Sequence, residues 1–345
     1  MKTAITPPTP ARDIYWDIWK GIAIIAVILI HTAAGWCGST KSGLVFQQFI
    51  DFPVFLFFAV AGYFSGEVKS GEALDFIKRK IRRLLPPFLL ASVLYAIAKS
   101  LLDRNFSIVA IMKRLPEFSC GFGYFVIALL SLFLIAPLFQ KIASIGMRLV
   151  SSAILSLLSI ASIYLLLEQG CCREMVPIPL PAIFFTTWIF AFTLGAALRE
   201  RTIENIGKAG IFWLVCGLVA ASLLAIGEAF FCERCGVMRI SLSQLKISSF
   251  LQSSLLFMLL CALNRRKSAC KYGEILAFLG RNSYFIYLYH WFYIAFYRKI
   301  SAGFSIGKVD FILPVAVVFS CAITAWLLRK FGSRRVAYWF GYSEI

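Results

Sequence analysis

The sequence predicts an all-α protein that crosses a membrane many times, and three observations support this fold class. Of the 345 residues, 60% are hydrophobic and only 15% are charged, whereas soluble domains have about 45–50% apolar and about 25% charged residues. Apolar stretches of about 20 residues, the length of a membrane-spanning helix, recur along the whole chain. Lys and Arg are concentrated in alternate connecting segments. Together these features exclude a water-soluble enzyme, a nucleic-acid-binding protein and a disordered protein.

Ten stretches qualify as membrane spans. They are residues 18–36, 45–65, 84–102, 122–140, 149–167, 180–198, 208–231, 245–263, 276–297 and 309–328. We therefore expect an N-terminal tail at 1–17, one transmembrane domain at 18–328 and a C-terminal tail at 329–345. The first stretch has the apolar run and small residues of a signal peptide, but nine further spans follow it in a continuing series, so we expect it to be retained.

The distribution of cationic residues predicts the orientation of these spans. Segments on the side of the two termini carry 21 Lys and Arg residues, and segments on the opposite side carry 10. Because positively charged loops stay in the cytoplasm, we expect both termini to be cytoplasmic. The net charge of +18 then fits loops that face the cytoplasm and anionic membrane lipid.

One cytoplasmic segment combines an apolar face with a dense positive charge. Leu74, Ile77, Ile81 and Leu84 recur at helical spacing. The basic residues beside them are Lys78, Arg79, Lys80, Arg82 and Arg83. The pattern predicts an interfacial helix at about 70–83, with Pro86 and Pro87 near its membrane end. Such a helix is either an anchor on anionic lipid or a phosphate-binding surface for an anionic cytosolic cofactor.

Six of the ten cysteines lie in or beside segments assigned to the outer side, which favours disulfide bonds and supports the orientation. They are Cys37, Cys120, Cys171, Cys172, Cys232 and Cys235. The last two have the spacing of half a zinc site. Because neither histidine of the chain is near them, we expect a disulfide there and no metal.

Both histidines of the chain fall within predicted spans, where ionisable side chains are costly and mark functional sites. His31 lies thirteen residues into the first span and His290 fourteen residues into the ninth, so both should lie at nearly the same depth. Asp51 lies at a matching depth on the antiparallel second span. We expect Asp51 to pair with His31, fixing the imidazole tautomer and stabilising the imidazolium that a general base becomes. His290 either lines the same cavity or only forms a hydrogen bond between helices.

Several motifs resemble those of acyltransferase family 3, whose members are integral-membrane enzymes that acylate bacterial cell-surface sugars. The resemblance begins with the run 17–23 (DIWKGIA), which is followed by His31. It continues through 52–64 (FPVFLFFAVAGYF), 78–88 (KRKIRRLLPPF), 123–137, 189–198 and 279–292. Lys20, where many members carry Arg, is similar to the fucose 4-O-acetylase-like branch. Asp51 stands where members often have His, and Ala61 where they often have Ser.

The resemblance implies an enzyme of the bacterial inner membrane that moves an acetyl group from cytosolic acetyl-CoA to a hydroxyl of a cell-surface or lipid-linked glycan. It implies that His31 is the general base or a transient acetyl carrier, and that Lys20 holds the thioester oxygen or a phosphate. The residues expected to bind the CoA phosphates are Arg79, Lys80, Arg82 and Arg83. The Arg-x-x-Arg pattern of the family fits this cluster in two registers.

On the acceptor side, Trp36, Tyr124 and Trp291 either stack on pyranose rings or belong to the interfacial aromatic belts. We expect no appended soluble esterase-like domain. A transporter or flippase for a lipid-linked sugar, with Lys20 and His31 along its path, stays open as an alternative, although no repeat relates the two halves of the chain. The same fold with another acyl donor or a small-molecule acceptor also stays open.

Overall fold

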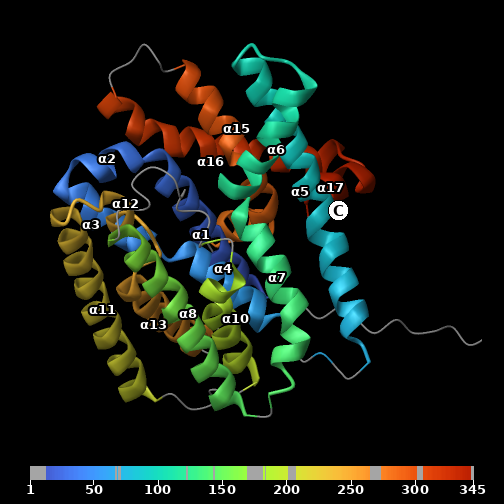
Figure 1. Cartoon of the computed structure of the whole chain (residues 1–345). Coiled ribbons are helices and arrows are strands. Elements are labelled where there is room, and N and C mark those ends of the chain that lie inside the picture. The colour runs from blue at the N-terminus through green and yellow to red at the C-terminus, as the bar shows by residue number, and fades with distance from the viewer. Residues whose placement is uncertain are drawn as a thin grey trace, which may run out of the picture.

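The structure, a computed structural model, describes residues 13–66, 68, 71–121, 123–142, 144–168, 182, 184–200, 207–264, 273–300 and 306–342. Within these residues the chain forms helices and no strands (Figure 1). The helices are α1 (Ile14–Thr32), α2 (Ala34–Ser39), α3 (Lys41–Ile50), α4 (Pro53–Tyr63), α5 (Ala73–Leu102), α6 (Ile108–Gly121), α7 (Tyr124–Phe139), α8 (Ile145–Glu168), α10 (Phe185–Glu200), α11 (Lys208–Arg234), α12 (Met238–Ser241), α13 (Ile247–Asn264), α14 (Glu274–Arg281), α15 (Ser283–Ile300), α16 (Ile306–Phe331) and α17 (Arg334–Phe340).

The predicted class, an all-α polytopic membrane protein, is confirmed, but fewer helices than the expected ten are long and apolar enough to span a bilayer. In the described part of the chain seven pass: α1, α3 with α4, α5, α8, α11, α13 and α16. The bent pair of α6 and α7 would be an eighth. The spans expected at 180–198 and 276–297 correspond to the 16-residue α10 and to the pair of α14 and α15, which is broken at Asn282. The cytoplasmic side of the termini stays a prediction.

The second expected span is broken at Asp51. Helix α3 ends at Ile50, and α4 begins at Pro53. Pro53 has no N–H to donate to the carbonyl of Phe49, four residues earlier, so the run of helical hydrogen bonds is interrupted here, although Asp51 and Phe52 keep helical backbone angles. Asp51 therefore lies at a junction between two helices, with only 2% of its surface exposed.

The expected interfacial helix and the third span form a single helix, α5, which runs through Pro86 and Pro87. Pro86 cannot donate a hydrogen bond to the carbonyl of Arg82, four residues earlier. That carbonyl instead accepts a hydrogen bond of 2.7 Å from the Tyr338 hydroxyl of α17. A tertiary contact thus satisfies a backbone group that the proline leaves open, which is how prolines are tolerated within membrane helices.

Two helix crossings at the centre of the molecule depend on glycine. Helix α1 packs on α14, and α4 packs on α10. A Cβ atom on Gly280 would lie 1.7 Å from the carbonyl oxygen of Asp17, and one on Gly195 would lie 1.8 Å from that of Ala59. Small residues at membrane helix interfaces permit such close approach of backbones. The first crossing fixes α1 beside the segment that leads directly into α15.

Polar side chains join the helices that lie outside this centre. Glu228 of α11 accepts hydrogen bonds from the Tyr164 hydroxyl of α8 (2.5 Å) and from the backbone N–H (3.0 Å) and hydroxyl of Ser248 on α13. Arg148 of α8 pairs with Glu200 of α10 at 2.6 Å. Figure 1 shows α11 and α5 at opposite edges of the molecule, with α1 and α4 between them.

Candidate functional site

The two histidines meet between α1 and α15. Their ring centroids lie 5.5 Å apart in a stacked arrangement, and the indole of Trp291 lies 4.7 Å from the ring of His31. His290 is completely buried, and His31 is half-buried near the end of α1. Helices that are far apart in the sequence thus bring two imidazoles and an indole into one cluster, the histidine cluster.

The hydrogen bonds of His290 determine which of its nitrogens is free to act. Its Nδ1 lies 2.8 Å from the carbonyl oxygen of Tyr287 and 3.2 Å from that of Ile286. Carbonyl oxygens only accept, so Nδ1 carries the proton, and Nε2 of the neutral ring presents a lone pair. This Nε2 is buried and has no hydrogen-bond partner among the described residues. A buried acceptor of this kind is suited to receive a hydrogen bond or a proton from a bound hydroxyl.

Asp51 does not pair with His31, so the expected His31–Asp51 pair is wrong. One carboxylate oxygen accepts a hydrogen bond of 2.6 Å from Gln47, and the other lies 3.1 Å from the Nζ of Lys246. Both members of the Asp51–Lys246 pair are buried, with side-chain exposures of 2% and 0%. A carboxylate at the break between α3 and α4 is stabilised more by a buried ammonium than by a neutral imidazole, because only the ammonium cancels its charge.

Lys246 is a site residue that the sequence analysis did not single out. It lies at the start of the span expected at 245–263, and an ionisable side chain beside such an apolar run is itself a signal of a polar partner within the protein. Its ammonium also donates to the carbonyls of Ser241 (3.1 Å) and Ser243. The segment before α13 is thereby held against α3 and α4.

Tyr124, at the start of α7, is connected to this same segment. Its hydroxyl accepts a hydrogen bond of 2.7 Å from Gln244. The next residue, Phe125, packs edge-on against Tyr287 (5.3 Å), whose ring centroid lies 6.1 Å from that of His290. Tyr124 therefore belongs to the surroundings of the histidine cluster. Trp36, by contrast, packs against Phe46 of α3 at 5.5 Å.

The basic residues of α5 divide into two sets. Arg79, Arg82 and Arg83 are exposed. The ammonium of Lys80 instead lies over the rings of Phe133 (4.5 Å) and Phe76 (5.2 Å), where a cation–π attraction stabilises it. Arg79 and Arg82 are thus an exposed pair at Arg-x-x-Arg spacing, while in the alternative register Lys80 is partly buried and Arg83 is exposed. Phosphate binding by these four residues stays a prediction.

Lys20 forms an ion pair within α1. Its Nζ lies 2.5 Å from a carboxylate oxygen of Asp17, which is buried, while Lys20 itself is 21% exposed. The α14 crossing at Gly280 packs on this turn of α1. The carboxylate balances the charge of the lysine and holds its side chain near the start of α1, away from His31 at the opposite end of the helix.

The cysteines correct a further expectation. Cys232 and Cys235 are both free, and the disulfide expected between them is absent. Cys232 is buried on α11, and Cys235 caps the same helix in an exposed position. Cys171 and Cys172 lie outside the described residues. Among the residues that the structure describes, no three His, Cys, Asp or Glu side chains converge as metal ligands.

The fold and the site define a polytopic membrane protein whose helical core holds a pair of imidazoles. The sequence profile described as an acyltransferase domain matches residues 13–329, most of the chain. The chain belongs to acyltransferase family 3, and it is a membrane acyltransferase. No curated protein and no solved structure matches it. Membership of the fucose 4-O-acetylase-like branch stays a prediction.

Proposed function

We propose that this acyltransferase moves an acetyl group from cytosolic acetyl-CoA to a hydroxyl of a cell-surface or lipid-linked glycan in the bacterial inner membrane. The single observation on which the chemistry depends is the stacking of His31 on His290, 5.5 Å apart, next to Trp291. In an acyltransferase, a half-buried imidazole stacked on a buried one whose Nε2 presents a lone pair is suited to activate a hydroxyl nucleophile.

In the proposed reaction His31 acts as the general base. It takes the proton of the acceptor hydroxyl while the hydroxyl oxygen attacks the thioester carbonyl, and the carbon–sulfur bond then breaks to release CoA as a thiolate that takes up a proton. Nε2 of His290 accepts a hydrogen bond from the incoming acceptor and orients it. Alternatively, His31 carries the acetyl group transiently and passes it to the acceptor.

The donor and the acceptor use different parts of the protein in this proposal. Arg79, Arg82 and Arg83 bind the phosphates of CoA, since a guanidinium forms two parallel hydrogen bonds with a phosphate. Lys20 contacts the thioester oxygen or a phosphate once its pair with Asp17 opens. Trp291 and Tyr124 lie around the histidine cluster, where they would contact the sugar.

The test compares the surface polysaccharide of cells that produce the wild-type protein, His31→Ala, His290→Ala or no protein. Mass spectrometry should find an added acetyl mass per sugar unit with the wild-type protein, and a loss of roughly 10²–10⁴-fold with His31→Ala because its general base is missing. Leu29→Ala, which truncates a neighbouring side chain of α1, is the matched control and should retain activity.

Protein amount and monodispersity in detergent are measured for every variant, so that a folding defect is recognised. The role of His31 is disproved if His31→Ala still acetylates at more than about a tenth of the wild-type rate. An added mass other than that of acetyl would show that the donor carries another acyl group. An identical polysaccharide with and without the protein would disprove the proposal of a glycan acceptor.

A further inference from the structure

The C-terminal helix α17 lies beyond the residues that match the family, and it docks on the basic part of α5. The Tyr338 hydroxyl of α17 donates to the carbonyl of Arg82, the backbone group that Pro86 leaves without its helical donor. Ala337 and Tyr342 are buried, and the Phe340 ring lies 5.4 Å from that of Tyr289 on α15. Defined contacts therefore fix α17 against both α5 and α15.

The chain leaves α17 through a residue that only glycine can occupy without strain. Gly341 has a φ of +73°, and a Cβ atom there would lie 2.9 Å from the ring of Tyr284. The Tyr284 hydroxyl in turn donates to the carbonyl of Leu84 at 2.6 Å. The end of α17, the start of α15 and the basic part of α5 thus meet at one point.

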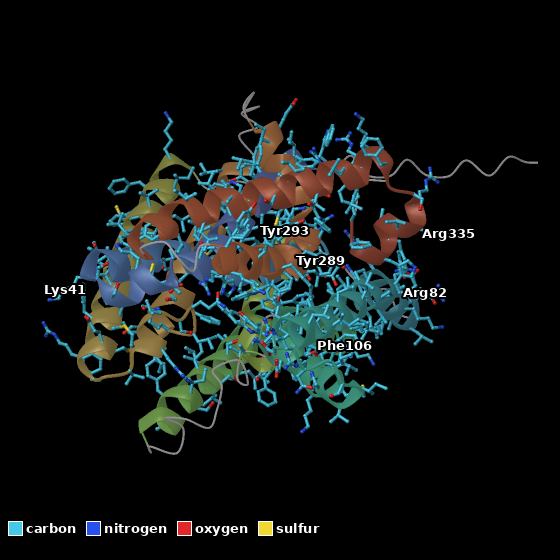
Figure 2. The ribbon with its side chains drawn as sticks, turned by 90° about the horizontal axis from the view of Figure 1, so that it is seen from above. Lys41, Arg82, Phe106, Tyr289, Tyr293 and Arg335 are labelled. Atoms are coloured by element: carbon cyan, nitrogen blue, oxygen red, sulfur yellow. The ribbon has the colours of Figure 1, made fainter. Side chains whose placement is uncertain are left out.

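This docking adds two arginines to those of α5. Arg334 and Arg335 begin α17 and are exposed, like Arg79, Arg82 and Arg83. Figure 2 shows Arg335 and Arg82 at the same edge of the molecule, opposite Lys41. Among the described residues, no carboxylate forms an ion pair with Arg79, Arg82, Arg334 or Arg335. An exposed surface rich in arginines has the geometry for bidentate recognition of phosphates.

We propose that Arg334 and Arg335 complete the phosphate-binding surface of α5 and bind phosphates of the CoA donor; this inference rests on the proposed function. CoA carries a pyrophosphate and a separate ribose phosphate, so its recognition needs cations from more than one direction. The surface also lies near the start of α15, the helix that carries His290. Tyr284 precedes His290 by six residues, about 9 Å along α15. A lipid anchor would need only the amphipathic α5 and no precise docking of a second helix.

The experiment measures CoA binding by titration calorimetry with the full-length protein in nanodiscs of neutral lipid. We expect the variant R334Q/R335Q to bind CoA about tenfold more weakly than the wild type, because two charge-assisted contacts are lost. Pantetheine, which lacks the phosphates, should bind both proteins equally. Lys41→Gln/Lys208→Gln removes the same charge from α3 and α11, and α11 lies at the opposite edge of the molecule from α5, so this variant should leave CoA binding unchanged.

The outcomes separate the inference from the proposed function. If the wild-type protein binds no CoA, both are overturned. If CoA binds the wild type and R334Q/R335Q equally while R79Q/R82Q weakens it, the inference alone is overturned. An effect of R334Q/R335Q that appears only as weaker binding to vesicles containing anionic lipid, with CoA binding unchanged, would make α17 a lipid anchor and would also overturn it. Circular dichroism and gel filtration confirm that each variant is folded.

Discussion

The buried pair of Asp51 and Lys246 should dominate the stability of the region around the histidine cluster. Lys246→Met removes an ammonium that lies 3.1 Å from Asp51, and it leaves a carboxylate that is 98% buried with Gln47 as its remaining partner. Removing one member of a buried pair costs about 3–5 kcal/mol, because the other charge stays in the interior without compensation. Asp51→Asn should have a cost of the same order.

The double variant Asp51→Asn/Lys246→Met tests this reasoning because it removes both charges together. It still leaves the carbonyls of Ser241 and Ser243 without the lysine donor, at about 1–3 kcal/mol for an unsatisfied group. Even so, it should be less destabilised than the sum of the two single variants by at least about 2 kcal/mol, since neither charge is left alone.

The free energies of unfolding are measured in mixed micelles by titration with a denaturing detergent, followed by circular dichroism. Single-variant effects that add within about 0.5 kcal/mol would refute the ion pair as the source of stability. Acetylation is measured in parallel. A stable Asp51→Asn protein that has lost all activity would instead indicate that Asp51 takes part in the reaction together with His31.

Two further predictions concern helix packing. Glu228→Ala leaves the hydrogen-bond donors of Tyr164 and Ser248 without their acceptor, and it should lower the free energy of unfolding by about 1–3 kcal/mol for each donor left unsatisfied; a change below about 0.5 kcal/mol would show that water or another group replaces the carboxylate. Gly195→Ala places a methyl group 1.8 Å from the Ala59 carbonyl oxygen, so it should separate α4 from α10 and abolish the monodisperse peak in gel filtration. The control Gly227→Ala, where nothing lies within 4 Å of the new Cβ, should behave like wild type, and equal behaviour of the two variants would argue against the crossing.

The fold class followed from composition and from the recurrence of apolar stretches, because a bilayer requires long apolar helices whatever their packing. The matching depth of His31 and His290 could be predicted from the sequence for a related reason. Each residue of a helix adds a fixed rise, so counting residues from the ends of two spans gives the relative depth of their side chains. The positive charge of 78–83 was equally visible, since charge depends on residue type alone.

The depth of a side chain in the membrane does not identify its neighbours, and the tertiary structure decided those. Counting residues places Asp51 at the depth of His31, yet the break before Pro53 and the approach of Lys246 give Asp51 a different partner. Lys80 has the same charge as its arginine neighbours, but its ammonium lies over the rings of Phe76 and Phe133. Which face of a helix meets which neighbour depends on the packing of all the helices at once, and no local pattern records it.

The C-terminal helix α17 shows most clearly what the sequence determines and what the tertiary structure determines. The sequence by itself determined that Pro86 and Pro87 lie near the membrane end of the basic segment, and that Arg334 and Arg335 follow the last expected span. Only the tertiary structure decided that Tyr338 supplies the missing donor and thereby places Arg334 and Arg335 at the edge occupied by Arg82. The physical reason is that an unsatisfied backbone carbonyl must find a partner, while the identity of that partner depends on which distant segment folds within hydrogen-bonding distance.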